Sequence, residues 1–149
     1  MWYCVGNGGV AAIRIAKKHG VKCVLNPAPA SELDGYILDT VDLFTPNEHE
    51  LFGIEEKENV IVTLGERGCL IKETGLIIPS KNSGATIDTT GAGDTFNGAL
   101  SAMLACGYKT AKAAEIANKV ASLEVTRRYA VSSIPAREEI KKIIQETEK

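Results

Sequence analysis

Apolar residues recur along the chain with two spacings, one typical of helices and the other of buried strands. In residues 10–19 they fall at Val10, Ile13 and Ala16, which lie on one helix face, and Gly20 follows as a stop. Residues 21–25 form a short β-branched run that Asn26-Pro27 ends, so we expect a strand there. Helix and strand patterns therefore alternate from the start of the chain.

The middle of the chain predicts more strands. Residues 59–64 (NVIVTL) are apolar at odd and even positions alike, as a strand buried on both faces requires. The remaining predicted strands are residues 41–45, 69–72, 76–78 and 85–87, with Glu73-Thr74-Gly75 as the turn of a hairpin. Only thirteen residues, Pro46 to Glu58, separate 41–45 from 59–64, which leaves space for one or two helical turns at 48–52.

Three helices follow. The first covers residues 94–106 before Gly107, Thr110 caps the second at 110–124, and Pro135 opens an amphipathic third that ends near Glu146. Strands that alternate with helices, followed by a helical tail, predict an α/β layered fold with a mostly parallel sheet flanked by helices. The length of 149 residues fits a single domain, residues 1–149.

Charge and cysteine content narrow the class of protein. Seventeen basic and nineteen acidic residues give a net charge of −2. This argues against a nucleic-acid-binding protein, because such proteins usually carry an excess of basic residues. No apolar run reaches the eighteen or so residues of a membrane helix, and we expect a soluble, cytoplasmic protein with no membrane partner. The four cysteines are scattered without a C-x-x-C pair, which favours buried thiols over disulfides or a zinc site.

The segment DTTGAGDTFNGAL, residues 88–100, carries the strongest chemical signal. A strand ends at Asp88, and a glycine-spaced turn opens a helix at Gly91 to Asp94. The first N–H groups of a helix have no internal partner and the helix dipole adds positive potential there, so this turn suits a phosphate. Asp94 at its rim would accept the proton of an attacking hydroxyl. The alternative is a glycine turn with Asp94 as an ordinary helix cap.

This segment resembles the second signature of the PfkB (ribokinase-like) carbohydrate kinases. Four other blocks are similar to that family in order and spacing: NPAPA at 26–30, TPNEHE at 45–50, VTLGERG at 62–68, and VTR at 125–127 followed by SIP at 133–135. The resemblance implies a ribokinase-like layered fold, truncated because it lacks the N-terminal lid half. It also implies transfer of the γ-phosphoryl group of ATP to a hydroxyl of a small, ribose-type sugar.

The resemblance implies a role for each matching residue. Asp94 would be the catalytic base, and the backbone of Gly91, Ala92 and Gly93 would form the anion hole. Asn47 would organise the phosphates, and Glu50 would hold Mg²⁺ through water. The nucleotide would also contact Thr63, Gly65, Glu66, Gly68 and Asn118. Each role has a plainer alternative: a cap of the short helix after Pro46 for Asn47, a turn cap for Asp88, a solvated helix carboxylate for Glu50, a buried strand hydroxyl for Thr63 and a surface or packing amide for Asn118.

The resemblance also implies a site for a monovalent cation such as K⁺. Asp88, Thr90 and Ser133, with carbonyl groups near Val125, match that site. Tyr129 stands where the family generally has glycine. If this position adopts a positive φ, we expect Tyr129 to carry strain or to reshape the loop.

The chain departs from the family pattern in its length. Family kinases are roughly twice as long, and their N-terminal half supplies lid strands, a Gly-Gly signature and most sugar-binding side chains. Gly8-Gly9 is only superficially similar to that pair, since Ile13 stands where an Asn would follow. Three hypotheses remain open: a sugar kinase that acts alone or with another chain, a nucleotide-binding module without turnover, and a half-domain that self-associates through exposed edges.

Overall fold

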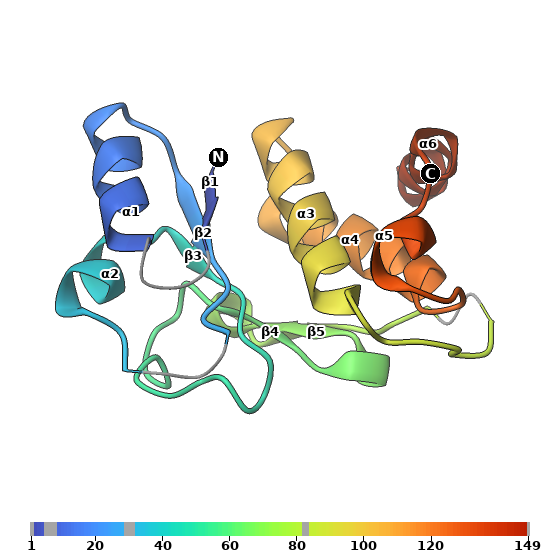
Figure 1. Cartoon of the computed structure of the whole chain (residues 1–149), viewed down its shortest axis with the longest axis horizontal. Helices are drawn as coiled ribbons and strands as arrows, with labels where there is room; N and C mark the ends of the chain where they lie inside the picture. Colours follow the sequence, from blue (N-terminus) through green and yellow to red (C-terminus); the bar gives the residue numbers. More distant parts are fainter. Residues whose placement is uncertain (1, 5–8, 29–31, 82–83, 149) are drawn as a thin grey trace. The chain divides into compact units, whose positions relative to one another are not determined.

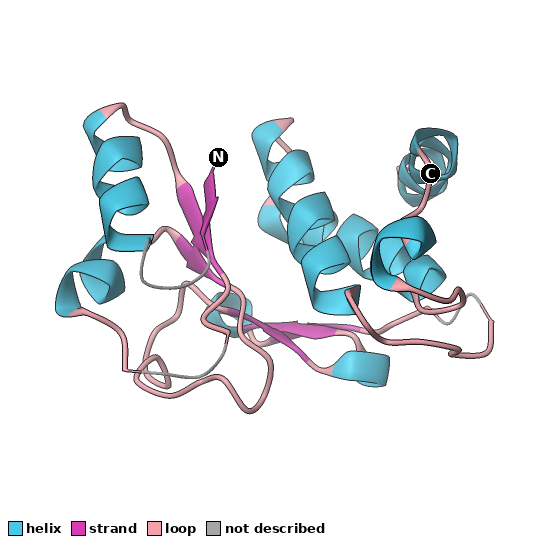
Figure 2. Ribbon diagram, in the orientation of Figure 1, coloured by secondary structure: helices cyan, strands magenta, loops and turns pink. Residues whose placement is uncertain are grey.

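The computed structural model describes residues 2–4, 9–28, 32–81 and 84–148, which form two compact units. The first unit is built from residues 1–65 and 70–77, and the second from residues 66–69 and 78–149. Figure 1 traces the elements in chain order, and Figure 2 separates helices from strands. The expectation of a single domain over residues 1–149 stays a prediction.

A parallel sheet organises the first unit. Its strand order is β1 (Trp2–Cys4), β2 (Cys23–Leu25) and β3 (Leu43–Phe44), with Tyr3 opposite Val24 and Val24 opposite Leu43. Parallel bridges from Phe44 to Val60 and from Asn47 to Thr63 extend this pairing toward β4 (Ile61–Thr63). The predicted strands at 21–25, 41–45 and 59–64 are therefore present in shortened form, and the parallel pairing is confirmed.

Helices α1 (Gly9–Lys18) and α2 (Gly35–Thr40) pack beside this sheet (Figure 1). Helix α1 ends where predicted, because Gly20 adopts a left-handed φ of 67°. Its buried side chains join an apolar core with the strands, made of Ile13, Ala16, Cys23, Leu25, Ile37, Val41, Phe44, Ile54, Val60 and Val62. Helix α2 has no counterpart in the sequence prediction, and the Asp34 carboxylate caps it by accepting a hydrogen bond from the Tyr36 N–H.

A second sheet has the strand order β4, β5 (Cys69–Ile71) and β6 (Leu76–Ile78). A 3₁₀ turn, η1 (Gly65–Arg67), precedes β5, and another, η2 (Lys72–Thr74), joins β5 to β6. Gly75 closes this connection with a φ of 65°. The hairpin that residues 73–75 predict is thus confirmed.

Four helices make up most of the second unit: α3 (Ala92–Ala105), α4 (Thr110–Glu124), α5 (Ala130–Ser133) and α6 (Arg137–Thr147). Helix α3 packs along α4, and α4 packs against α6. The Lys119 ammonium group reaches both Glu115 on its own helix and the Thr147 hydroxyl group on α6, 2.7 Å away. Within the described residues, no helix is both long and apolar enough to cross a membrane.

The structure corrects three local predictions. Residues 48–52 form hydrogen-bonded turns and not helical turns, since the Glu50 N–H already donates to the Asn47 carbonyl group. Residues 85–87 are not a strand, because the Ile87 N–H donates to the carbonyl group of Val125 at the end of α4. Thr110 is the first residue of α4 and not its cap, which is Lys109.

Candidate functional site

The N-terminus of α3 is entered through a left-handed glycine. Gly91 has φ 91° and ψ −4°, a conformation that other residues avoid. The Ala92 N–H donates to the Thr89 carbonyl group (3.2 Å), and the Thr95 N–H closes the first helical turn on Gly91 (2.8 Å). The N–H groups of Gly93 and Asp94 lie in this first turn, where no helical carbonyl group precedes them. They give this end of α3 the partial positive charge that attracts an anion.

Two residues of this turn are open to solvent. Gly93 is exposed, and a Cβ atom there would meet no atom within 4 Å, so a ligand can approach the backbone closely. Asp94 is also exposed and is the acidic residue of the first turn. Amide groups and a carboxylate therefore face solvent together, as an anion hole with an adjacent base requires.

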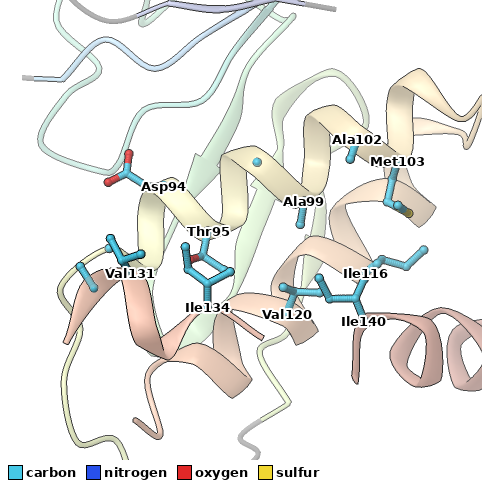
Figure 3. A pocket seen from close by; sticks show the side chains of 13 residues that line it. Asp94, Thr95, Ala99, Ala102, Met103, Ile116, Val120, Val131, Ile134 and Ile140 are labelled. Carbon is cyan, nitrogen blue, oxygen red and sulfur yellow. The ribbon is translucent and has the colours of Figure 1, made fainter. Parts of the chain in front are cut away.

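Asp94 also borders a pocket of about 370 Å³ among the four helices of the second unit. Figure 3 shows Asp94 at one end of this pocket, with its carboxylate directed away from Val131 and Ile134. The lining is otherwise mostly apolar and comes from α3, α4, α5, α6 and their flanking residues. The apolar side chains of this lining cannot bind a phosphate. The polar groups that border the pocket lie at the N-terminal end of α3.

The structure brings Asn47, Glu50 and Thr63 together in the first unit. The Asn47 N–H donates to the Glu50 carboxylate (3.0 Å), while the Asn47 side-chain oxygen accepts from the His49 N–H (2.8 Å). Thr63 pairs with this turn, since its N–H donates to the Pro46 carbonyl group (2.9 Å). The spacing N-x-x-E thus builds a rigid turn, and the roles of these residues toward phosphates and Mg²⁺ stay predictions.

Residues 65–68 form the tight loop between β4 and β5. Gly65 begins the 3₁₀ turn with a φ of 58°, and Glu66 is exposed at its tip. Gly68 has a φ of 97°, and a Cβ atom there would lie 2.0 Å from the Ile78 carbonyl oxygen and 2.6 Å from the Ser80 nitrogen. Close backbone packing therefore requires Gly68, a structural demand that the sequence reading did not identify.

Asn118 is buried on α4, with 7 % of its surface exposed. Its side-chain Nδ2 atom donates to the Ile78 carbonyl group (2.9 Å), and its backbone carbonyl group accepts from the Ser122 hydroxyl group (2.7 Å). The side chain thus ties α4 to the end of β6, as the packing alternative expects. Its predicted contact with a nucleotide base stays a prediction.

Asp88 is held by the backbone around it. One carboxylate oxygen accepts from the Thr90 N–H (3.0 Å) and the other from the Tyr129 N–H (3.2 Å). The hydrogen bonds from Thr90, and after them the one from Tyr129, lower the pKa of Asp88, so this carboxylate stays charged. Tyr129 has a φ of 72°, which confirms the expected strain at this position.

Glu124, the last residue of α4, is a buried acid that the sequence reading missed. It is fully buried, and one carboxyl oxygen lies 2.8 Å from the Ser133 hydroxyl oxygen. The other oxygen has no hydrogen-bond partner among the described residues. Burial raises the pKa of Glu124, and the charge of Asp88 raises it further. Its place four residues after Val120, on the buried stripe of α4, was the available signal.

The predicted cation site thus has a donor set made of oxygen atoms. Asp88, Thr90 and Ser133 carry the oxygen donors of that predicted site, and their role toward a monovalent cation stays a prediction. Glu124, which was not part of the prediction, adds a carboxyl oxygen without a hydrogen-bond partner among the described residues. The Val125 carbonyl group offers no free lone pair, because the N–H groups of Ile87 and Asp88 already occupy both. In the described ranges no three acidic, histidine or cysteine side chains gather as a metal cluster, so hydroxyl and carbonyl groups would complete this site.

Comparisons with known proteins find similar sequences and similar solved structures. The ribokinase of Haemophilus influenzae is 38 % identical over 154 residues, a match covering 89 % of this chain and 50 % of the relative. The ribokinase structure from Thermotoga maritima superimposes with a TM-score of 0.78 at 31 % identity, covering 90 % of this chain and 52 % of that one. The structure of the Arabidopsis thaliana ribokinase complexed with ribose and ATP superimposes with a TM-score of 0.79 at 26 % identity, and the match covers 91 % of this chain and 51 % of that one.

The chain therefore spans about half the length of these relatives. The similar structures confirm the ribokinase-like α/β fold. A family model described as pfkB family carbohydrate kinase matches residues 7–137, which include the α3 turn and the Asn47–Glu50 turn. This chain belongs to the pfkB family of carbohydrate kinases.

Proposed function

We propose that this chain carries the phosphoryl-transfer residues of a sugar kinase that moves the γ-phosphoryl group of ATP to a hydroxyl group of a ribose-type sugar. The observation that carries this proposal is the left-handed entry of Gly91, which presents the first-turn amide groups of α3 beside exposed Asp94. The ribose and ATP bound in the Arabidopsis thaliana relative support the choice of substrates.

In the proposed reaction the sugar oxygen attacks the γ-phosphorus atom, the bond to ADP breaks, and the proton of the sugar hydroxyl group passes to Asp94. The N–H groups of Gly93 and Asp94 stabilise the charge on the transferred group, because a helix N-terminus needs no reorganisation to do so. Positioning and electrostatics supply most of the rate in such transfers.

Magnesium would act from the first unit. One Glu50 oxygen accepts from the Asn47 N–H, which fixes the carboxylate and leaves its remaining lone pairs for water bound to the metal. When bound, Mg²⁺ neutralises charge on the β- and γ-phosphates. Asn47 and Thr63, positioned by the same turn, would contact the nucleotide. We also assign nucleotide contacts to Gly65, Glu66, Gly68 and Asn118.

Asp94→Asn tests the role of the base. We expect turnover of ATP with D-ribose to fall by about 10²–10⁴-fold, because the amide cannot accept the proton. Nucleotide affinity, measured by calorimetry with MgCl₂, should stay within threefold of wild type. Asp39→Asn changes another exposed aspartate, on α2, and should leave both quantities unchanged. Wild-type turnover in Asp94→Asn would contradict the assignment.

A second candidate is a nucleotide-binding half-kinase that lacks turnover by itself and self-associates or needs a partner chain. The observation that favours it is the coverage of only about half of the relatives' length. Under this alternative, Mg²⁺-dependent ATP binding persists while no ADP forms with D-ribose. Absence of ATP binding at millimolar nucleotide would contradict both candidates.

A further inference from the structure

The hydroxyl group of Ser122 links α4 to the segment that follows β6. Ser122 is buried and lies one helical turn after Asn118 on the same face of α4. Its hydroxyl group donates to the Asn118 backbone carbonyl group (2.7 Å), and its oxygen lies 2.8 Å from the Ser80 hydroxyl oxygen. A serine hydroxyl group has one hydrogen to donate. Because Ser122 uses this hydrogen on Asn118, the Ser80 hydroxyl group is the donor in the second contact.

A second hydrogen bond from α4 reaches the same segment. The Asn118 side-chain Nδ2 atom donates to the Ile78 carbonyl group (2.9 Å), two residues before Ser80. Pro79 lies between them, with a φ that its ring fixes and without an N–H group. Helix α4 therefore holds residues 78–80 at both ends, through the Ile78 backbone and through the Ser80 side chain.

Gly68 packs against the backbone of this segment. A Cβ atom on Gly68 would lie 2.0 Å from the Ile78 carbonyl oxygen and 2.6 Å from the Ser80 nitrogen. At this separation Gly68 cannot shift toward residues 78–80 unless they shift with it, because packed atoms leave no void between them. All of these contacts lie within the second compact unit. The position of residues 78–80 therefore sets the position of Gly68.

We propose that Ser122 and Ser80 are positioning residues for the nucleotide, because they hold the segment against which Gly68 packs. This inference rests on the proposed function, in which Gly68 and Asn118 contact the nucleotide. Neither serine lies in a sequence block that resembles the family. A backbone that is held in its binding conformation pays less ordering entropy when the ligand arrives, so loss of the hydroxyl groups weakens nucleotide binding.

Ser122→Ala removes the acceptor of the Ser80 hydroxyl group. We expect the Kd for ATP, measured by calorimetry with MgCl₂, to rise about three- to tenfold, as the loss of one neutral hydrogen bond implies. The KM for ATP should rise by the same factor, while kcat with D-ribose stays unchanged. Ser101→Ala is the matched control, because the buried Ser101 hydroxyl group on α3 has no hydrogen-bond partner among the described residues. It should bind ATP like wild type.

Ser80→Ala breaks the same contact from the other side and keeps the proposal testable if Ser122→Ala does not fold, since Ser80 is only half-buried. It should raise the Kd for ATP by a similar factor. The double variant should bind ATP no more weakly than Ser122→Ala alone, because both changes remove one shared contact. Additive losses of affinity would overturn the proposal.

Amide hydrogen exchange tests the positioning without any nucleotide. In Ser122→Ala or Ser80→Ala, exchange at residues 66–69 should be about three- to tenfold faster than in wild type, with exchange along α3 unchanged. Wild-type exchange at residues 66–69, or wild-type ATP affinity in both variants, would overturn the proposal. A wild-type chain that binds no ATP would instead contradict the proposed function, and faster exchange in the variants would still show that the serines fix this loop.

Discussion

At the residue scale, two glycines that both have a positive φ differ in whether the surrounding structure leaves space for a side chain. Gly65 and Gly68 both have positive φ and flank the same 3₁₀ turn. A Cβ atom at Gly65 would meet nothing within 4 Å, whereas one at Gly68 would overlap the Ile78 carbonyl oxygen. A side chain at Gly65 would therefore meet conformational strain alone, whereas a side chain at Gly68 would meet both strain and a steric collision.

We expect Gly68→Ala to destabilise the fold by more than about 3 kcal/mol, because the new methyl group adds a backbone collision to the strain of a positive φ. Gly65→Ala, the matched control, should cost only about 1–2 kcal/mol from the left-handed conformation. Urea unfolding measures both free energies of unfolding. Equal costs for the two variants would show that the packing at Gly68 is not the limiting factor.

The same scale shows what the sequence could predict about the site. The glycine-rich turn and Asp94 follow from local spacing, because a helix N-terminus and its first residues are contiguous in the chain. The strain at Tyr129 was expected from the family resemblance, because a tyrosine stands where the family generally has glycine, and the positive φ meets that condition. The hydrogen bond of Glu124 and the packing demand at Gly68 could not be predicted, because each depends on a contact outside its own local segment, with Ser133 and with Ile78.

At the element scale, one ion pair fixes the start of α6. Arg127 binds both carboxylate oxygens of Glu139, and Glu139 also accepts from the Ala136 N–H that precedes the helix. The Arg127 hydrogen bond, followed by the one from Ala136, lowers the pKa of Glu139 below its ordinary range. The ion pair between Arg127 and Glu139 therefore connects the two ends of the segment that carries Ser133.

A lowered pKa makes this contact sensitive to acid. Its stabilisation is present above the ordinary glutamate pKa and is lost as the pH falls through the lower pKa of the folded state. We expect Glu139→Gln to melt below wild type at pH 7, and the difference to shrink once the pH is well below roughly 4. Glu138→Gln is the control, because it removes a neighbouring carboxylate that pairs with exposed Lys141 on the same helix. A difference independent of pH would contradict an ionic origin.

Helices with a full apolar period were predictable, and short ones were not. The residue spacing identified α1, α3, α4 and α6 to within a few residues. Helices α2 and α5 have six and four residues, too few for a 3.6-residue period to show. The segment 85–87 has strand composition, but the Ile87 N–H donates to the Val125 carbonyl group at the end of α4.

At the scale of the whole molecule, apolar side chains remain on the surface of the second unit. Tyr129, Val131 and Ile134 lie within six residues of one another and are 72 %, 84 % and 49 % exposed. Large apolar side chains gathered in one exposed segment favour association with another surface. This feature bears on the alternative of a self-associating half-kinase.

We expect the purified chain to self-associate with rising concentration, because association removes this apolar segment from water. Val131→Glu should shift the average mass measured by light scattering toward the monomer. Ile15→Glu changes a similarly exposed apolar residue on α1, 63 % exposed, and should leave the mass unchanged. A monomer at every concentration would count against association through this segment.

The left-handed conformation of Gly91 has one more consequence. It reverses the chain within a single residue, between the loop that carries Asp88 and the helix that carries Asp94. Two acidic residues six positions apart in sequence therefore have different surroundings. Asp88 accepts a hydrogen bond from the Tyr129 N–H, and Asp94 is exposed to solvent. A residue with a right-handed conformation at this position would change the direction in which the chain enters α3, so the separate surroundings of Asp88 and Asp94 depend on a glycine.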